Sequence, residues 1–93
     1  MIIGMMEIDL FSEQFHSLKE KRRLLSSLKE RLKNKFNIAV AESDYQDLWQ
    51  KAQLTAVSLG ANRSMLESTF RQIEEFIFLN YAVQVSKIRI QYF

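Results

Sequence analysis

Cations crowd the beginning of a predicted helix, in the stretch SLKEKRR at residues 17–23. The first turn of an α-helix carries partial positive charge and points unpaired N–H groups at solvent, so cations there oppose the local field. Free N–H donors surrounded by side-chain cations suit a phosphate group. The pattern therefore predicts that this helix binds RNA phosphates, through Lys19, Lys21, Arg22, Arg23, Lys29 and Lys33.

The charge of the whole chain is segregated onto the same segment. Residues 16–36 carry a net charge of +6, whereas the rest of the chain carries −4, although the total is only +2. Such asymmetry favours an anionic partner for this one element. The alternative is an ordinary solvated helix face, since a Ser17 cap of about 1 kcal/mol offsets much of the dipole cost and Glu20 and Glu30 can pair with nearby cations.

Six elements are expected to position these residues. Residues 2–11 and 83–93 alternate as strands do, and residues 17–35 and 64–79 place apolar side chains at helical spacing. Residues 36–42 and 51–60 are predicted to be two further strands, joined by the polar loop SDYQDLWQ. Two pairs, Ser17 with Glu20 and Ser64 with Glu67, match the capping box at a helix start.

The order βαββαβ predicts an α+β fold that occupies residues 1–93 as a single domain. Two right-handed βαβ crossovers and one hairpin assemble most simply into a ferredoxin-like plait. Its four-stranded antiparallel sheet has the order 4-1-3-2, with both helices on one face. The first and last strands are then neighbours, so that Glu7 and Asp9 on the open face are expected to meet Lys87 and Arg89.

The open face of this sheet is predicted to carry more apolar side chains than a solvated surface needs. A symmetric homodimer through the sheets would cover them, whereas scattered exposed apolar residues are also common on monomers. The same face lacks the aromatic platform with which RNA-recognition motifs stack bases, so RNA is expected on the basic helix instead. The predicted interface residues are Ile3, Met5, Val57, Leu59, Val83 and Val85.

Other chemistry has little support in the sequence. There is no cysteine, and His16 is the only histidine, so a typical zinc site or a catalytic triad lacks its components. The glycine-rich loops that hold nucleotides are missing, and the acidic residues near Asp44 lack the spacing of a calcium loop. We predict no catalytic residue, metal or cofactor, and no small-molecule substrate. Trp49 is expected to be a hydrophobic plug at the sheet edge rather than a binding residue.

The segments EIDL, SLKEKR, FNIAVAE and QDLWQKAQL, taken together, resemble the YlxP-like bacterial family, a domain of uncharacterised biochemical function. The resemblance extends over nearly the whole chain, from Met1 to Phe93. It implies a ferredoxin-like fold and, because genes of this family commonly lie beside those of translation and ribosome-maturation factors, a role near RNA or the ribosome. It implies no catalytic residues.

These observations lead to one functional hypothesis and two alternatives. The chain is expected to be a non-enzymatic RNA-binding or ribosome-associated accessory protein. It is expected to be cytoplasmic, because it lacks a basic leader, a bilayer-spanning segment and cysteine. The first alternative is a protein–protein adaptor or structural homodimer that uses the apolar sheet face and the Trp49 loop. An enzyme is a more distant alternative.

Overall fold

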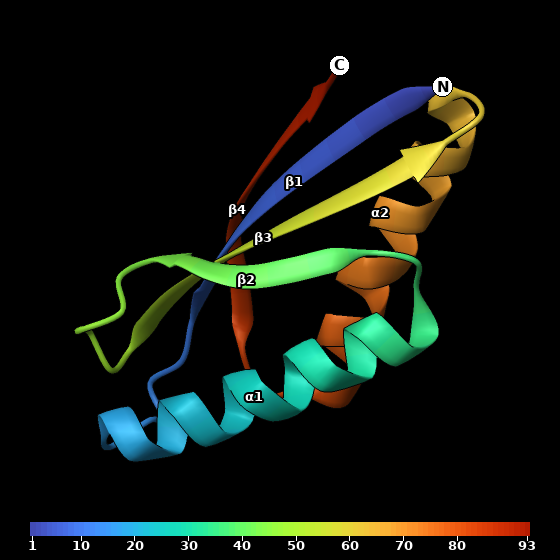
Figure 1. Ribbon diagram of the computed structural model, residues 1–93. Coiled ribbons are helices and arrows are strands. Elements are labelled where there is room, and N and C mark those ends of the chain that lie inside the picture. The colour runs from blue at the N-terminus through green and yellow to red at the C-terminus, as the bar shows by residue number, and fades with distance from the viewer.

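The computed structural model describes residues 1–93 and has the predicted element order (Figure 1). Neither helix has an apolar stretch long enough to cross a membrane. The six elements are β1 (Ile2–Phe11), α1 (Leu18–Lys35), β2 (Ala39–Asp44), β3 (Lys51–Gly60), α2 (Arg63–Asn80) and β4 (Gln84–Tyr92).

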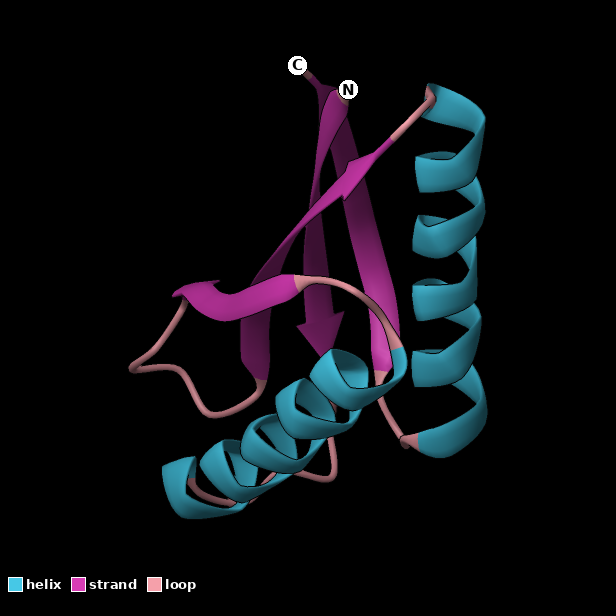
Figure 2. Cartoon of the chain, turned by 45° about the vertical axis from the view of Figure 1, so that its right-hand side comes forward, coloured by secondary structure: helices cyan, strands magenta, loops and turns pink.

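The four strands form one antiparallel sheet with the order β2-β3-β1-β4. This is the predicted order 4-1-3-2 read from the opposite edge. Both helices share one hydrophobic core with the inward side chains of β1 and β3. In Figure 2, α2 runs alongside the long strands, whereas α1 lies beneath β2 at the other end of the sheet.

The core follows directly from the alternation in β1. Met6, Ile8 and Leu10 are buried, and they pack with leucines of α1 and with Phe70 of α2. Gly4 allows α2 to approach closely, because a Cβ atom at this position would lie 2.8 Å from Phe70 Cε2. Odd-numbered residues of β1 consequently face away from the helices and form the open face.

The predicted start of α1 is confirmed. Ser17 is the N-cap, and its Oγ accepts a hydrogen bond of 3.1 Å from Glu20 N. The returning bond of the capping box reaches one residue further back, since Glu20 Oε2 accepts from the backbone N–H of His16 at 3.0 Å.

The predicted capping box at the start of α2 is wrong. The N-cap is Asn62, whose Oδ1 accepts a hydrogen bond of 3.0 Å from Met65 N. The helix therefore begins at Arg63, and Glu67 forms an ion pair with Arg63 rather than bonding to the cap.

The strand predicted for residues 36–42 also begins later than expected. Phe36 is the C-cap of α1 and donates its N–H to Leu32 O at 2.9 Å, so this residue still belongs to the helix end. The strand β2 starts only at Ala39.

An irregularity in β4 overturns the predicted position of two valines. Asp9 pairs with Lys87 but Leu10 pairs with Val85, so Ser86 is an additional residue in β4. An inserted residue moves every side chain beyond it to the other face. Val83 and Val85 therefore pack against the core beneath the helices, and the prediction that they lie on the open face is wrong.

Candidate nucleic-acid interface

Five of the six predicted phosphate-binding residues lie along the outer side of α1. Most of these positions are three, four or seven residues apart and share the helix side opposite the buried Leu25, Leu28 and Leu32, whereas Lys29 is half-buried beside that stripe. From the first to the last cation the row is about 21 Å long, at a rise of 1.5 Å per residue. We call this row the outer band; it consists of Lys19, Arg22, Arg23, Lys29 and Lys33.

Almost none of the cations in the outer band is neutralised by an ion pair within the chain. Its one ion pair joins Lys33 Nζ to Glu30 Oε2 at 3.8 Å, and both side chains are at least half exposed. Pairs of this kind contribute little to stability and leave the cation available to solvent. Lys19, Arg22 and Arg23 are exposed and make no ion pair.

The remaining cations at the end of α1 have a different role. Arg31 donates hydrogen bonds to Tyr81 Oη at 3.1 Å and to Asn80 Oδ1 at 3.3 Å, and its guanidinium lies 4.9 Å from the centre of the Phe76 ring. Lys35 also lies over Phe76, at 5.0 Å. These two residues connect α1 to the end of α2, which agrees with their omission from the predicted phosphate site.

Lys21 does not belong to the interface, and its prediction as a phosphate ligand is wrong. Its side chain is completely buried, and Nζ donates hydrogen bonds of 2.6 Å to both Tyr45 O and Leu48 O. Nζ also lies 3.0 Å from Glu42 Oε2, as an ion pair without the alignment of a hydrogen bond. An ammonium has three N–H donors, and this site surrounds it with three oxygen atoms.

The burial of Lys21 had a signal in the sequence. Position 21 continues the stripe of Leu25, Leu28 and Leu32 at intervals of four, three and four residues, which is the periodicity of a core-facing helix side. The residue type suggested solvent, but the position indicated burial. Glu42, which faces the helix from β2, is the partner that makes a buried lysine tolerable.

The loop between β2 and β3 is held in place by Lys21. Tyr45 has a positive φ of 61°, a conformation that is unfavourable for a residue with a side chain, and its N–H is bonded by Asp44 Oδ1 at 2.7 Å. Leu48 and Trp49 follow in the same loop, and Trp49 remains 42% exposed. Trp49 is therefore only partly buried, although it was expected to be a hydrophobic plug at the sheet edge.

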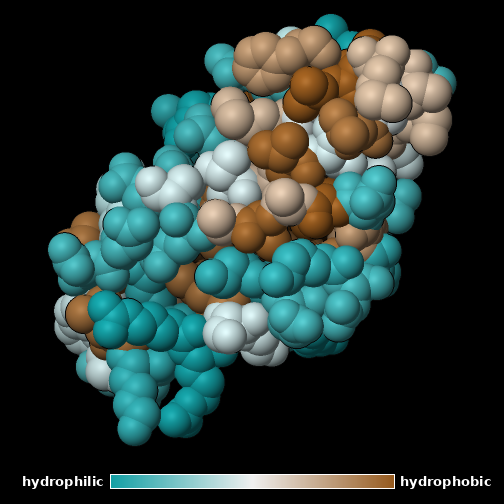
Figure 3. Space-filling view, viewed as in Figure 1, coloured by the Kyte–Doolittle hydropathy of each residue, from teal (hydrophilic) through white to brown (hydrophobic).

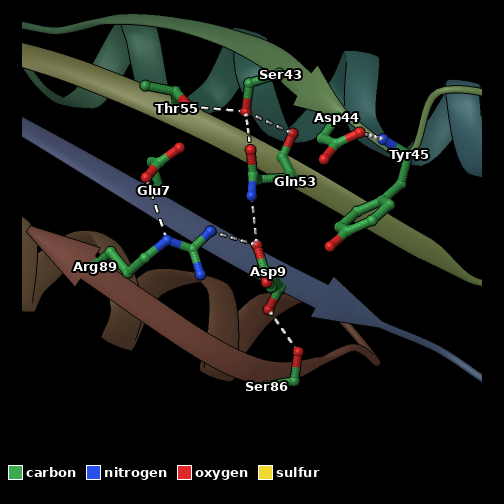
Figure 4. A network of polar contacts seen from close by, with 9 residues as sticks. All are labelled: Glu7, Asp9, Ser43, Asp44, Tyr45, Gln53, Thr55, Ser86 and Arg89. Carbon is green, nitrogen blue, oxygen red and sulfur yellow. Dashed lines mark hydrogen bonds and ion pairs between the residues drawn. The ribbon is translucent and has the colours of Figure 1, made fainter.

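Opposite charges meet on the open face near the middle of β1, as predicted (Figure 4). Arg89 donates from Nε to Glu7 Oε1 at 3.2 Å and from Nη2 to Asp9 Oδ1 at 3.3 Å. The bond to Glu7 is the main cause that raises the pKa of Arg89 above its ordinary value. Lys87 stands opposite Asp9 in the strand register, but Asp9 forms its ion pair with Arg89 alone.

A chain of hydrogen bonds extends this cluster toward β2. Gln53 Nε2 donates to Asp9 Oδ1 at 2.9 Å, Ser43 Oγ donates to Gln53 Oε1 at 2.8 Å, and Thr55 Oγ1 donates to Ser43 Oγ at 2.7 Å. Sequence reasoning missed Ser43, because it is the additional residue in the β2–β3 pairing and the loop was expected to begin there. The middle of the open face is thus a satisfied polar network without aromatic residues.

The other half of the open face is apolar. Figure 3 shows its hydrophobic side chains gathered where β1 begins and β3 ends. Ile3 is 41% exposed and Leu59 52% exposed, and the C-terminal Phe93 pairs with Ile3 through two backbone hydrogen bonds. We call this surface the apolar patch; it retains four of the six predicted interface residues and gains Phe93, and it consists of Ile3, Met5, Val57, Leu59 and Phe93.

Comparison with known proteins identifies a matching family, a related sequence and a solved structure with a similar fold. The family described as "Protein of unknown function (DUF503)" matches residues 3–90. The uncharacterized protein YlxP of Bacillus subtilis (strain 168) is 33% identical over 76 residues, which are 82% of this chain and 83% of that relative. A solved structure, the de novo designed protein Ferredog-Diesel, superimposes with a TM-score of 0.52 at 13% identity. That match covers 96% of this chain and 83% of the designed one, and it concerns the fold alone.

Proposed function

This chain belongs to the DUF503 family of proteins of unknown function and is similar to YlxP, and we propose that it is a non-enzymatic RNA-binding accessory protein. The outer band of α1 docks on RNA phosphates, in a free RNA or in the ribosome, with little reading of base sequence. Such a role places the protein in the cytoplasm. The observation that supports the proposal is a row of five cations, four exposed and one half-buried, with a single weak ion pair within the chain.

Electrostatics distinguish α1 from the other surfaces. The open face carries Glu7 and Asp9, which both form ion pairs with Arg89, and the middle of this face lacks the aromatic platform on which RNA-recognition motifs stack bases. The exposed surface of α1 instead carries these five cations and two acids, Glu20 and Glu30. Phosphate contacts supply most of the affinity of sequence-independent RNA binding, so α1 is the face that fits a polyanion best.

Titration of a short single-stranded RNA into isotopically labelled protein is expected to shift the amide NMR signals of α1. The largest shifts should fall on residues 19–33, whereas the signals of Glu7 and Thr55 on the open face should hardly move. Helix amides report directly on charges that arrive beside the helix, including those near its N-terminus.

The opposite pattern would contradict the proposed site. If the shifts concentrate on β1 and β3, RNA binds the sheet; if saturating RNA moves no signal, the protein does not bind this class of ligand. Heparin, a polyanion without bases, is titrated at the same total charge as a control. The difference between the two titrations shows how much of the signal shift is specific to RNA.

A further inference from the structure

The outer edge of β4 is not paired with any other strand. In the sheet order β2-β3-β1-β4, this strand has β1 on one side only, as Figure 1 also shows. Free N–H and C=O groups along such an edge are a template for another strand, and proteins usually protect them. No proline occurs in β4, and the features that could protect its edge, Ser86, Lys87 and Arg89, all precede Ile90.

Along β4, successive residues direct their backbone N–H and C=O groups alternately toward β1 and away from it. This alternation identifies which backbone groups are free. Ile3 and Phe93 exchange both N–H···O bonds, at 3.0 and 2.8 Å. Because bonded pairs alternate in an antiparallel ladder, the backbone of Arg89 and Gln91 also points toward β1. The backbone groups of Ile88, Ile90 and Tyr92 consequently point outward, away from the sheet.

An open groove runs beside this edge, between α2 and β4. Its volume is about 570 Å³ where it is bounded by Phe78 and Val85, and it continues along Ile88, Ile90 and Tyr92. Ile90 is 41% exposed even though its side chain is on the helix side of the sheet. An added strand would thus find both free backbone groups and an apolar flank.

We propose that the occupant of this edge is a second copy of β4, antiparallel to the first and related to it by a two-fold axis through Ile90. In this register Ile90 bonds to Ile90 of the partner subunit, and Ile88 bonds to Tyr92 of the partner subunit. Apolar side chains of both copies then form one row on the helix side. The two sheets join into a continuous eight-stranded sheet.

Charge selects this register over its neighbours. Strand β4 has no acidic residue but contains Lys87 and Arg89, so registers shifted toward the start of the strand place two cations opposite each other, which is destabilising. With the axis at Ile90, Arg89 faces Gln91 of the partner subunit and Lys87 faces Phe93 of the partner subunit. This is the longest pairing that keeps these cations apart.

Charges on α2 favour the same arrangement. Arg71 and Glu74 both line the groove beside Ile90. A two-fold axis through Ile90 reverses the direction of the second helix, and it brings Arg71 of each copy toward Glu74 of the partner subunit. The surface is thus complementary to itself, as an isologous contact requires. This proposal places the homodimer contact at the strand edge, whereas the sequence analysis expected it on the open face.

Hydrogen exchange tests the proposed pairing, because only every second amide of β4 points outward and would be protected by the partner strand. At millimolar concentration of the intact protein, the amides of Ile88, Ile90 and Tyr92 are expected to exchange at least about tenfold more slowly than in dilute solution. The amides of Arg89 and Gln91, which are bonded to β1, should be protected at both concentrations. If the outward amides exchange equally fast at both concentrations, the proposed pairing is absent.

Two substitutions with the same change in charge locate the contact. Ile90→Lys places two like charges on the axis and is expected to leave the protein monomeric in sedimentation at all concentrations. Leu59→Lys adds the same charge to the apolar patch on the open face and should leave the dimer intact. Circular dichroism of both variants checks that the fold is retained.

Three results would overturn the inference. They are a wild-type protein that is monomeric up to millimolar concentration, a dimer that survives Ile90→Lys, and a dimer that is lost only in Leu59→Lys. The last result would assign self-association to the open face. None of these outcomes bears on RNA binding by α1, which is measured separately.

Discussion

Replacing Lys21 by methionine is expected to lower the free energy of unfolding by about 3–5 kcal/mol, the usual cost of removing one partner of a buried ion pair. The substitution leaves Tyr45 O and Leu48 O without their shared donor and Glu42 without its cation. Methionine has a similar length, so the loss reflects the charge and the hydrogen bonds rather than a cavity. Urea unfolding followed by circular dichroism measures the change.

Lys19→Met is the matched control, because it removes the same charge from an exposed position two residues earlier. Its effect on unfolding is expected to stay within about 0.5 kcal/mol, as for most surface substitutions. A cost below about 1 kcal/mol for Lys21→Met would show that the buried ammonium contributes little. In that case the loop between β2 and β3 must be held by other contacts.

Reversing three charges in the outer band is expected to abolish most RNA binding. The variant Lys19→Glu, Arg22→Glu, Arg23→Glu removes three phosphate contacts, and at about 1 kcal/mol for each contact the affinity falls at least about 100-fold. Fluorescence anisotropy of a labelled single-stranded RNA measures the loss. Stability should change in the opposite direction, because an acid in the first helical turn interacts favourably with the helix dipole.

If the variant binds RNA more weakly but is as stable as the wild type or more stable, the loss of binding is not caused by misfolding. A control variant with Lys51, Arg71 and Lys87 changed to glutamate alters the net charge by the same amount on other surfaces. It is expected to retain most of the affinity. If both triple variants lose affinity equally, only the overall charge matters and α1 is not a specific docking surface.

The sequence was sufficient to predict the fold because its two periodicities are clear. The alternation of Met6, Ile8 and Leu10 and the spacing of Leu25, Leu28 and Leu32 specify which sides are buried. The sequence specifies the ends of the helices less clearly than their buried sides. Asn62 and Ser64 are both good N-cap residues, and only the geometry after β3 decides that Asn62 caps α2.

One feature of the structure left no mark in the periodicity, and another was indicated by the periodicity but opposed by the residue type. A single additional residue at Ser86 moves Val83 and Val85 to the core, and a two-residue alternation contains no mark of such a bulge. Lys21 is the opposite case, because its position on the leucine stripe indicated burial while its charge indicated solvent. The deciding partner, Glu42, comes from a different strand.

The dependence of RNA affinity on salt concentration tests the central claim most directly. Five phosphate contacts by the outer band predict a slope of log affinity against log salt of about −3.5, at about −0.7 for each contact with a single strand. The glutamate triple variant should reduce the magnitude of this slope to about 1.4. A wild-type affinity that does not change with salt, or an identical slope in the folded triple variant, would contradict RNA docking on α1.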